Sequence, residues 1–262
     1  MNRLESKFAQ LRQNQQRGFI PFITAGDPNL KATRNLILEL ANTGATAIEL
    51  GVPFSDPMAD GPIIQRASER ALRNDVNISA ILEMVVEVRK LTEVPLVLFS
   101  YYNPLLQFGI EKLAREAASA GIDAVLITDL PPEESEKIQI ILASKQIKMI
   151  YLVAPTTTDA RLKNIAAKAS GFIYAVSRNG VTGIAEQENL ESEKLVRRVR
   201  DFTDLPVAVG FGISSRAHVA NVLRYADAAI VGSAIVAEIE QHRDNADLVQ
   251  HVGRFARALL SD

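Results

Sequence analysis

Cysteine is absent from this chain of 262 residues, which excludes disulfide bonds and cysteine-ligated metal sites. A reducing cytosol is the environment that suits such a chain best, so we predict a cytoplasmic protein. Positive charge is not in excess either, because the formal net charge is −2, and no basic surface for nucleic acid is expected. No apolar run approaches the roughly 18–20 residues that a membrane-spanning helix needs. Residues 1–16 are polar and of mixed charge, and predict a short amphipathic helix instead of a signal peptide.

Short apolar segments alternate with longer amphipathic ones along the chain. The apolar segments predict eight strands, at residues 18–24, 47–50, 95–100, 124–128, 148–153, 172–176, 207–210 and 228–231. Helical spacing predicts helices between them, at residues 29–42, 63–74, 78–91, 109–120, 158–169 and 190–202, with others beginning at Pro131, Ser214, Ser233 and Ala246. Asp27 followed by Pro28 is interpreted as the start of the first of these helices.

The order of these elements predicts the fold. Unbroken apolar strands that alternate with helices are typical of a parallel sheet covered by helices. Eight such units in roughly 250 residues fit a (β/α)8 TIM barrel, an α/β fold, with an extra N-terminal helix and a short extra helix after strand eight. We expect a single domain over residues 1–262. A doubly wound open sheet is the alternative, and the eight units disfavour it.

Glycines cluster at the carboxyl ends of the last strands, where barrel active sites are built. Gly210 and Gly212 follow strand seven, Gly232 and Ser233 follow strand eight, and a glycine-rich loop at residues 180–183 follows strand six. Glycine allows backbone N–H groups to approach an anion, and the next helix adds the positive end of its dipole. The three sites together predict a phosphate site, although each glycine alone also fits an ordinary turn.

Acidic residues stand at the end of strand two and in the loop after it. Alternation along the strand places Glu49 on the face opposite Ile48 and Leu50, pointing into the barrel. Burial there would raise its pKa, so that it donates and accepts a proton near neutral pH; a structural glutamate is the alternative. Asp60 lies close enough to return to the barrel mouth, or forms a turn before Gly61. Asp56 and Asp129 are interpreted as structural loop or cap acids.

Groups that are missing from the strand ends disfavour two mechanisms. No lysine stands there, since Lys148 begins strand five, which disfavours a Schiff-base aldolase. The three histidines, His218, His242 and His251, fall on predicted helices, which disfavours a metal aldolase, and we expect no metal. Acid–base chemistry on a phosphorylated substrate with an apolar, aromatic half remains. Its apolar mouth, unless these residues are ordinary core, would be Phe22, Phe99, Tyr101, Leu126, Tyr174 and Phe211.

Six segments carry a resemblance to a known family over about residues 18–233. They are ELGVPFSDPMADGP (49–62), FITAGDP (22–28), YYNP (101–104), DLPP (129–132), SRNGVTG (177–183) and GFGISS (210–215). This combination closely resembles the tryptophan synthase alpha chain family. The resemblance implies a barrel lyase of tryptophan biosynthesis that cleaves indole-3-glycerol phosphate to indole and D-glyceraldehyde 3-phosphate, without a metal or a Schiff base.

The resemblance also implies roles for individual residues. Glu49 would carry the proton transfers, and Asp60 would hold the indole N–H. Thr182 would bond to Asp60 when its loop closes over the site. The residues implied to hold the indole are Phe22, Phe99, Leu126, Leu152, Tyr174 and Phe211. Those implied to bind phosphate are Gly183, Gly212, Gly232 and Ser233.

A partner chain is implied as well. The family's alpha chain works in an alpha2beta2 heterotetramer with a beta chain, which carries pyridoxal phosphate and joins indole to serine; no cofactor is implied for this chain itself. The apolar loop after strand two fits the contact, through Val52, Pro53, Phe54, Asp56, Pro57 and Met58. Two alternatives stay open: a stand-alone indole-3-glycerol phosphate lyase that releases free indole, and a non-catalytic barrel that only binds phosphate compounds. The intact Glu49 and Asp60 argue against the second.

Overall fold

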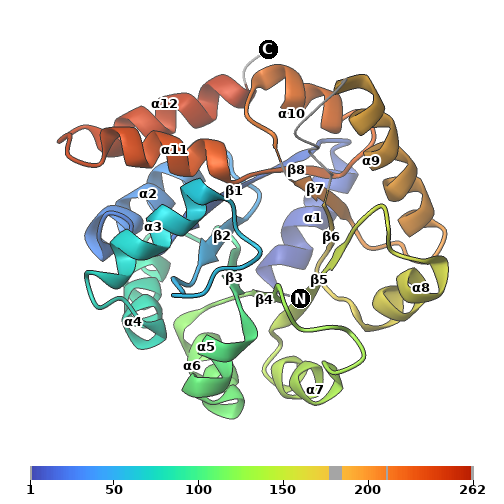
Figure 1. Ribbon diagram of the computed structural model, residues 1–262, viewed down its shortest axis with the longest axis horizontal. Helices are drawn as coiled ribbons and strands as arrows, with labels where there is room; N and C mark the ends of the chain where they lie inside the picture. Colours follow the sequence, from blue (N-terminus) through green and yellow to red (C-terminus); the bar gives the residue numbers. More distant parts are fainter. Residues whose placement is uncertain (1, 177–184, 211, 261–262) are drawn as a thin grey trace.

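Eight parallel strands close into a barrel in chain order in the computed structural model, which describes residues 2–176, 185–210 and 212–260 (Figure 1). The strands are β1 (Gly18–Thr24), β2 (Ile48–Gly51), β3 (Leu96–Ser100), β4 (Ala124–Ile127), β5 (Lys148–Val153), β6 (Ile173–Val176), β7 (Val207–Gly210) and β8 (Ala228–Val231). Pairing of β1 with β8 closes the ring, which confirms the predicted barrel and excludes the open sheet.

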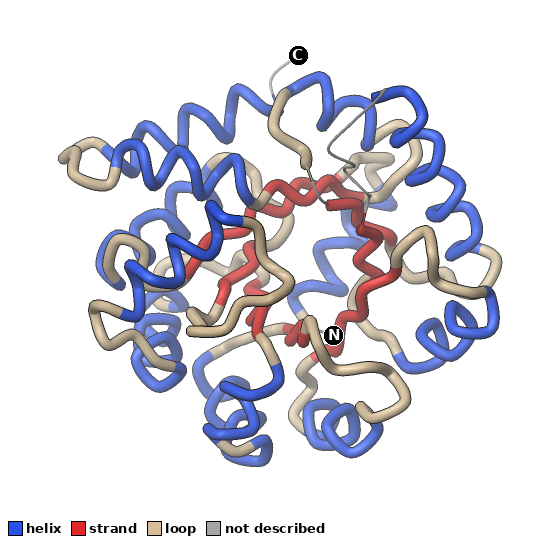
Figure 2. The backbone as a smooth tube through the Cα atoms, viewed as in Figure 1, coloured by secondary structure: helices blue, strands red, loops and turns tan. Residues whose placement is uncertain are grey.

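A ring of helices surrounds the strands, as Figure 2 shows. In chain order they are α2 (Leu30–Asn42), α3 (Pro62–Leu72), α4 (Ile78–Arg89), α5 (Tyr102–Phe108), α6 (Ile110–Ala120), α7 (Glu136–Ser144), α8 (Asp159–Lys168), α9 (Ala185–Arg200), α10 (Arg216–Val222), α11 (Ser233–His242) and α12 (Leu248–Leu260). The glycines that the sequence marks as helix ends, Gly44, Gly121 and Gly171, all have positive φ angles between 84° and 97°.

Side chains alternate between two separate cores, as the strand pattern requires. Ile48 and Leu50 of β2 pack outward against the helices, in the large core that includes Leu96 and Leu98. Ala47, just before β2, points into the barrel with Val97, Leu126 and other inward residues. Glu49 shares this inward register.

The N-terminal helix α1 (Arg3–Gln13) covers the amino-terminal end of the barrel. Its buried residues Leu4, Phe8 and Leu11 join the interior core, and the rings of Phe8 and Phe172 lie 5.7 Å apart. This confirms the amphipathic helix expected from the sequence. With that end covered, the carboxyl ends of the strands are left for the chemistry.

Three local predictions were wrong. Asp27 does not cap α2, because Asn29 does so by accepting a hydrogen bond from the Ala32 N–H at 2.9 Å. The helix predicted to begin at Pro131 is α7, and it begins at Glu136, because residues 132–134 form a turn. Helix α5 was missed: it follows β3 directly, and Asp129 caps it by accepting from the Tyr102 N–H at 2.6 Å. Asp129 is thus a structural loop acid, but its bond goes to the helix of the preceding βα unit and not to the helix that follows it.

Among the residues that the structure describes, no helix combines the length and apolar character needed to cross a bilayer. The eight strands belong to one barrel. A single domain over residues 1–262 stays a prediction.

Candidate active site

Glu49 is the one acid inside the barrel among the described strand residues. It lies on β2 between Phe22 of β1 and Val97 of β3, and is 1% exposed. Burial in this apolar setting raises the pKa of its carboxyl to about 8. Within the described part of the chain its Oε1 has no hydrogen-bond partner. An unpaired carboxyl that is protonated at neutral pH is a group suited to proton transfer.

Asp60 lies in the loop between β2 and α3. Burial raises the pKa of its carboxyl to about 6, and a hydrogen bond with the Tyr101 hydroxyl opposes the rise. Asp60 lines a small void of about 10 Å³ together with Phe22 and Phe99. The loop therefore brings this acid back to the barrel mouth, against aromatic side chains of β1 and β3.

A hydroxyl that the sequence reasoning did not single out lines the same void. Thr24 ends β1 two residues after Phe22, so alternation places both on the inward face. Its Oγ1 is buried and has no partner among the described atoms. A buried hydroxyl without a partner in an apolar wall indicates a functional site. The alternation along β1 is the sequence signal from which Thr24 could have been predicted to face this site.

Four of the apolar candidates pair across neighbouring strands. Strand register pairs Phe99 with Leu126, and Leu152 with Tyr174. The Phe22 and Phe99 rings meet edge to face, with centroids 5.3 Å apart. A Cβ atom at Gly51 would overlap the Phe22 ring, and one at Gly210 would overlap the Tyr174 ring. These two glycines therefore make room for aromatic rings, a role that the sequence analysis did not give them.

The phosphate candidates stand where β7 and β8 end. Gly212 has a φ of +67°, a backbone conformation that favours glycine. Gly232 precedes α11 and provides no side-chain cap, so no capping side chain occupies the first N–H groups of this helix. Three sequence candidates, Thr182, Gly183 and Phe211, lie outside the described residues.

The loop expected to contact a partner divides into two parts. Val52 and Pro53 are buried, and Val52 joins the outer core. Phe54 and Pro57 are half-buried, Asp56 is exposed, and Met58 is 86% exposed. Only the tip of the loop is free to touch another molecule, whereas its first two residues support the barrel.

Lys148 and the three histidines lie on the elements that the sequence predicts for them. Lys148 begins β5 and pairs with Glu5 at 2.5 Å at the amino-terminal end. His218, His242 and His251 lie on α10, α11 and α12.

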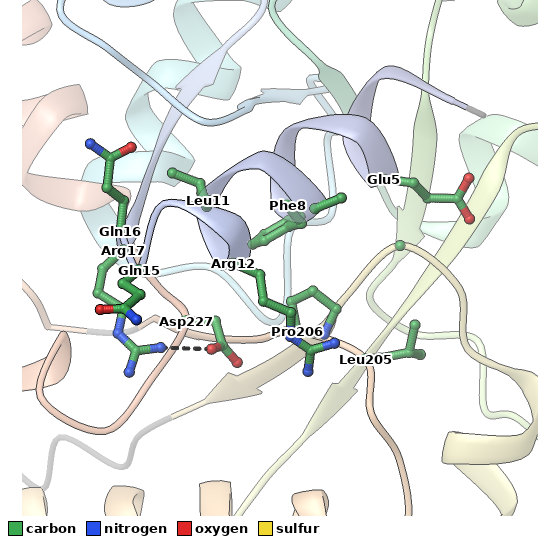
Figure 3. A pocket seen from close by; sticks show the side chains of 12 residues that line it. Glu5, Phe8, Leu11, Arg12, Gln15, Gln16, Arg17, Leu205, Pro206 and Asp227 are labelled. Carbon is green, nitrogen blue, oxygen red and sulfur yellow. Dashed lines mark hydrogen bonds and ion pairs between the residues drawn. The ribbon is translucent and has the colours of Figure 1, made fainter.

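A cavity of about 580 Å³ opens at the amino-terminal end of the barrel, beside α1 (Figure 3). Arg12 and Gln15 line it, Phe8 and Leu11 form part of its apolar wall, and Arg17 pairs there with Asp227 at 2.8 Å. None of the candidate residues lies in it. The larger opening is thus not where the acids and aromatic rings meet.

Comparison with known proteins agrees with this geometry. A family model described as tryptophan synthase alpha chain matches residues 8–259. The chain belongs to the tryptophan synthase alpha chain family. The tryptophan synthase alpha chain of Citrifermentans bemidjiense is 44% identical, over 99% of this chain and 97% of its own length.

Solved structures give the same family and fold. The alpha subunit from Legionella pneumophila superposes with a TM-score of 0.91 at 36% identity, covering 99% of this chain and 98% of that one. A chain of the tryptophan synthase a2b2 complex from Pyrococcus furiosus gives 0.86 at 38%, covering 93% and 97%. Membership in the tryptophan synthase alpha chain family confirms the expected enzyme class, a carbon–carbon lyase acting on indole-3-glycerol phosphate.

Proposed function

We propose that Glu49 and Asp60 divide the work in a retro-aldol cleavage of indole-3-glycerol phosphate to indole and D-glyceraldehyde 3-phosphate. The observation that carries this is the order of their pKa values, about 8 for Glu49 and about 6 for Asp60. At pH 7 the first is protonated and the second is ionised. Two carboxyls held in opposite protonation states are suited to opposite roles in one reaction.

Glu49 carries the proton transfers. Its protonated carboxyl donates to C3 of the indole ring, and the carboxylate left behind accepts the proton of the side-chain hydroxyl. The bond between C3 and the hydroxyl-bearing carbon then breaks, its electrons return to the ring, and the former carbinol carbon becomes the aldehyde. The proton count balances, because Glu49 ends as it began. Its position beside Phe22 and its lack of a fixed partner support this role.

Asp60 holds the indole nitrogen. Protonation at C3 places positive charge on the ring, and an ionised carboxylate near the N–H stabilises that charge. The rings of Phe22 and Phe99 meet Asp60 in the same void, which supports an indole site there. Leu126, Leu152 and Tyr174 complete its described wall, and Phe211 is proposed from the sequence.

The phosphate group binds at the carboxyl ends of β7 and β8. Gly212, Gly232 and Ser233 supply backbone N–H groups, and α11 adds the positive end of its dipole. Gly183, and Thr182 as the closing contact to Asp60, are proposed from the sequence alone.

The partner is a beta chain in an alpha2beta2 assembly, and indole passes to it. The supporting surface is a groove of about 670 Å³ between the β2–α3 loop and α5. Phe54 and Phe108 line this groove, and the exposed Met58 lies on the same loop. We propose that pyridoxal phosphate belongs to the beta chain and that this chain's reaction uses no cofactor. The expectation of a cytoplasmic location stays a prediction.

Steady-state release of indole from indole-3-glycerol phosphate, measured with and without the cognate beta chain, tests the proposal. We expect slow release by this chain alone and an increase on adding the partner. Fast release that the partner does not change would identify a stand-alone lyase. Absence of release in both conditions would leave a phosphate-binding barrel without this activity.

A further inference from the structure

One arginine connects three βα units around β1. Arg70 of α3 donates to both carboxylate oxygens of Asp27, through Nε at 2.7 Å and Nη2 at 2.8 Å. Its third nitrogen, Nη1, donates to Oε1 of Glu240 on α11 at 2.6 Å. Asp27 follows β1, α3 follows β2 and α11 follows β8, so the guanidinium joins segments that are far apart in the sequence.

This ion cluster is built into the fold. Asp27 is 1% exposed, and the Arg70 side chain is mostly buried. Arg66, one turn earlier on α3, binds Glu240 through two bonds of 2.7 Å from the exposed side. Hydrogen bonds from Arg66 and Arg70 hold the pKa of the Glu240 carboxyl down at about 2, so Glu240 is charged at neutral pH.

The two helices that the cluster joins begin at the two ends of the proposed substrate site. Helix α3 starts two residues after Asp60, and α11 starts at Ser233. They lie side by side outside β1 (Figure 1). Ala67 of α3 and Val236 of α11 pack together with Phe22, so the apolar part of this contact reaches the proposed indole site.

We propose that Arg70 is a positioning residue that, through Asp27 and Glu240, fixes the spacing between the Asp60 loop and the phosphate end of α11. The inference rests on the proposed function, because it needs a substrate held at both ends. Two binding sites raise the affinity for one linked molecule only when the distance between the sites matches the length of that molecule. A misplacement of reacting groups by about 1 Å lowers the reaction rate roughly 100-fold. Arginine suits this role because its planar group makes directed bonds to two carboxylates, which a lysine ammonium does not reproduce.

The test compares a linked ligand with its two halves. The linked ligand is indole joined through a propyl chain to phosphate, which cannot be cleaved; the halves are indole and glycerol 3-phosphate. Binding is measured by titration calorimetry for wild type, Arg70→Lys and Glu240→Gln. We expect both variants to lose about tenfold in affinity for the linked ligand while each half binds within about twofold of wild type. We expect kcat/KM for indole-3-glycerol phosphate to fall in parallel.

Two controls separate positioning from general damage. Arg89→Lys alters another buried ion pair, in which Arg89 contacts Asp123 at 2.9 Å at the amino-terminal end of the barrel. This variant should leave unchanged the ratio of the affinity for the linked ligand to the affinities for its two halves. Arg66→Ala removes only the exposed contact to Glu240 and should change that ratio less than twofold.

The inference is overturned if the halves lose as much affinity as the linked ligand, or if the linked ligand binds both variants normally. Should Arg70→Lys fail to fold, Glu240→Gln decides by the same ratio. Failure of wild type to bind the linked ligand more tightly than its halves would instead contradict the proposed function.

Discussion

Tyr101 ties the loop that carries Asp60 to the end of β3: its hydroxyl accepts a hydrogen bond from the Ala59 N–H at 2.9 Å. The same hydroxyl forms a hydrogen bond with the Asp60 carboxyl, and this bond reduces the rise that burial causes in the pKa of Asp60. We expect Tyr101→Phe to loosen the loop and to raise the pKa of Asp60 above about 6. Turnover should fall about tenfold, and the acidic limb of the kcat/KM profile should move to higher pH. An unshifted acidic limb would show that this bond does not tune Asp60.

Asp60→Asn removes the charge but keeps the shape of the side chain. If the carboxylate stabilises positive charge on the indole ring, turnover should fall roughly 100-fold, the usual effect of losing one such group. Affinity for glycerol 3-phosphate should change little, because the phosphate end is separate. Equal losses in turnover and in phosphate affinity would mean that the substitution disturbs the whole mouth of the barrel.

Glu49→Gln should alter the pH dependence of stability. The folded-state pKa of Glu49 is about 8, whereas the unfolded value is near 4.5. Between these values the folded protein keeps a proton that the unfolded chain has released, so the contribution of Glu49 to stability is lost as pH rises. Glutamine does not titrate, and the variant should gain on the order of 4 kcal/mol over wild type on going from pH 4.5 to pH 8, because each unit of pKa difference corresponds to about 1.4 kcal/mol. Denaturant unfolding at both pH values measures this, and a pH-independent difference would contradict the shifted pKa.

Met58→Asp should weaken the partner contact. Met58 is 86% exposed at the tip of the β2–α3 loop, and a charge there opposes an apolar interface. We expect at least a tenfold loss in affinity for the beta chain, measured by titration. Leu91→Asp is the matched control, since Leu91 is also exposed, at 58%, but precedes β3 at the opposite end of the barrel. Equal effects of both substitutions would argue against a specific contact at Met58.

Elements with a clear local pattern were predictable from the sequence. β8 was predicted at its observed bounds from its unbroken apolar run, and Glu49 could be placed inside the barrel from the alternation of Ala47, Ile48 and Leu50. These predictions succeed because an apolar run and strand alternation are both local properties of the sequence. Glu49 was also recognisable as a functional candidate, because burying an unpaired carboxyl in an apolar strand costs free energy of folding unless the group has a function.

Contacts between distant segments were not predictable in the same way. Asp27 before Pro28 looks like a helix cap, but its partner is Arg70, which is 43 residues away. The short helix α5 was missed because its cap, Asp129, comes from the next βα unit. The pair Arg66 and Arg70, one turn apart on α3, was the only local sign of the cluster with Glu240.

The central claim is that Glu49 transfers the protons, and single-turnover indole release by Glu49→Gln tests it most directly. A positioned acid–base group contributes about 10²–10⁴-fold. We predict a loss of that size at pH 7, with the fold intact by circular dichroism and the linked indole–phosphate ligand still bound. Indole release within a few-fold of wild type would contradict the account.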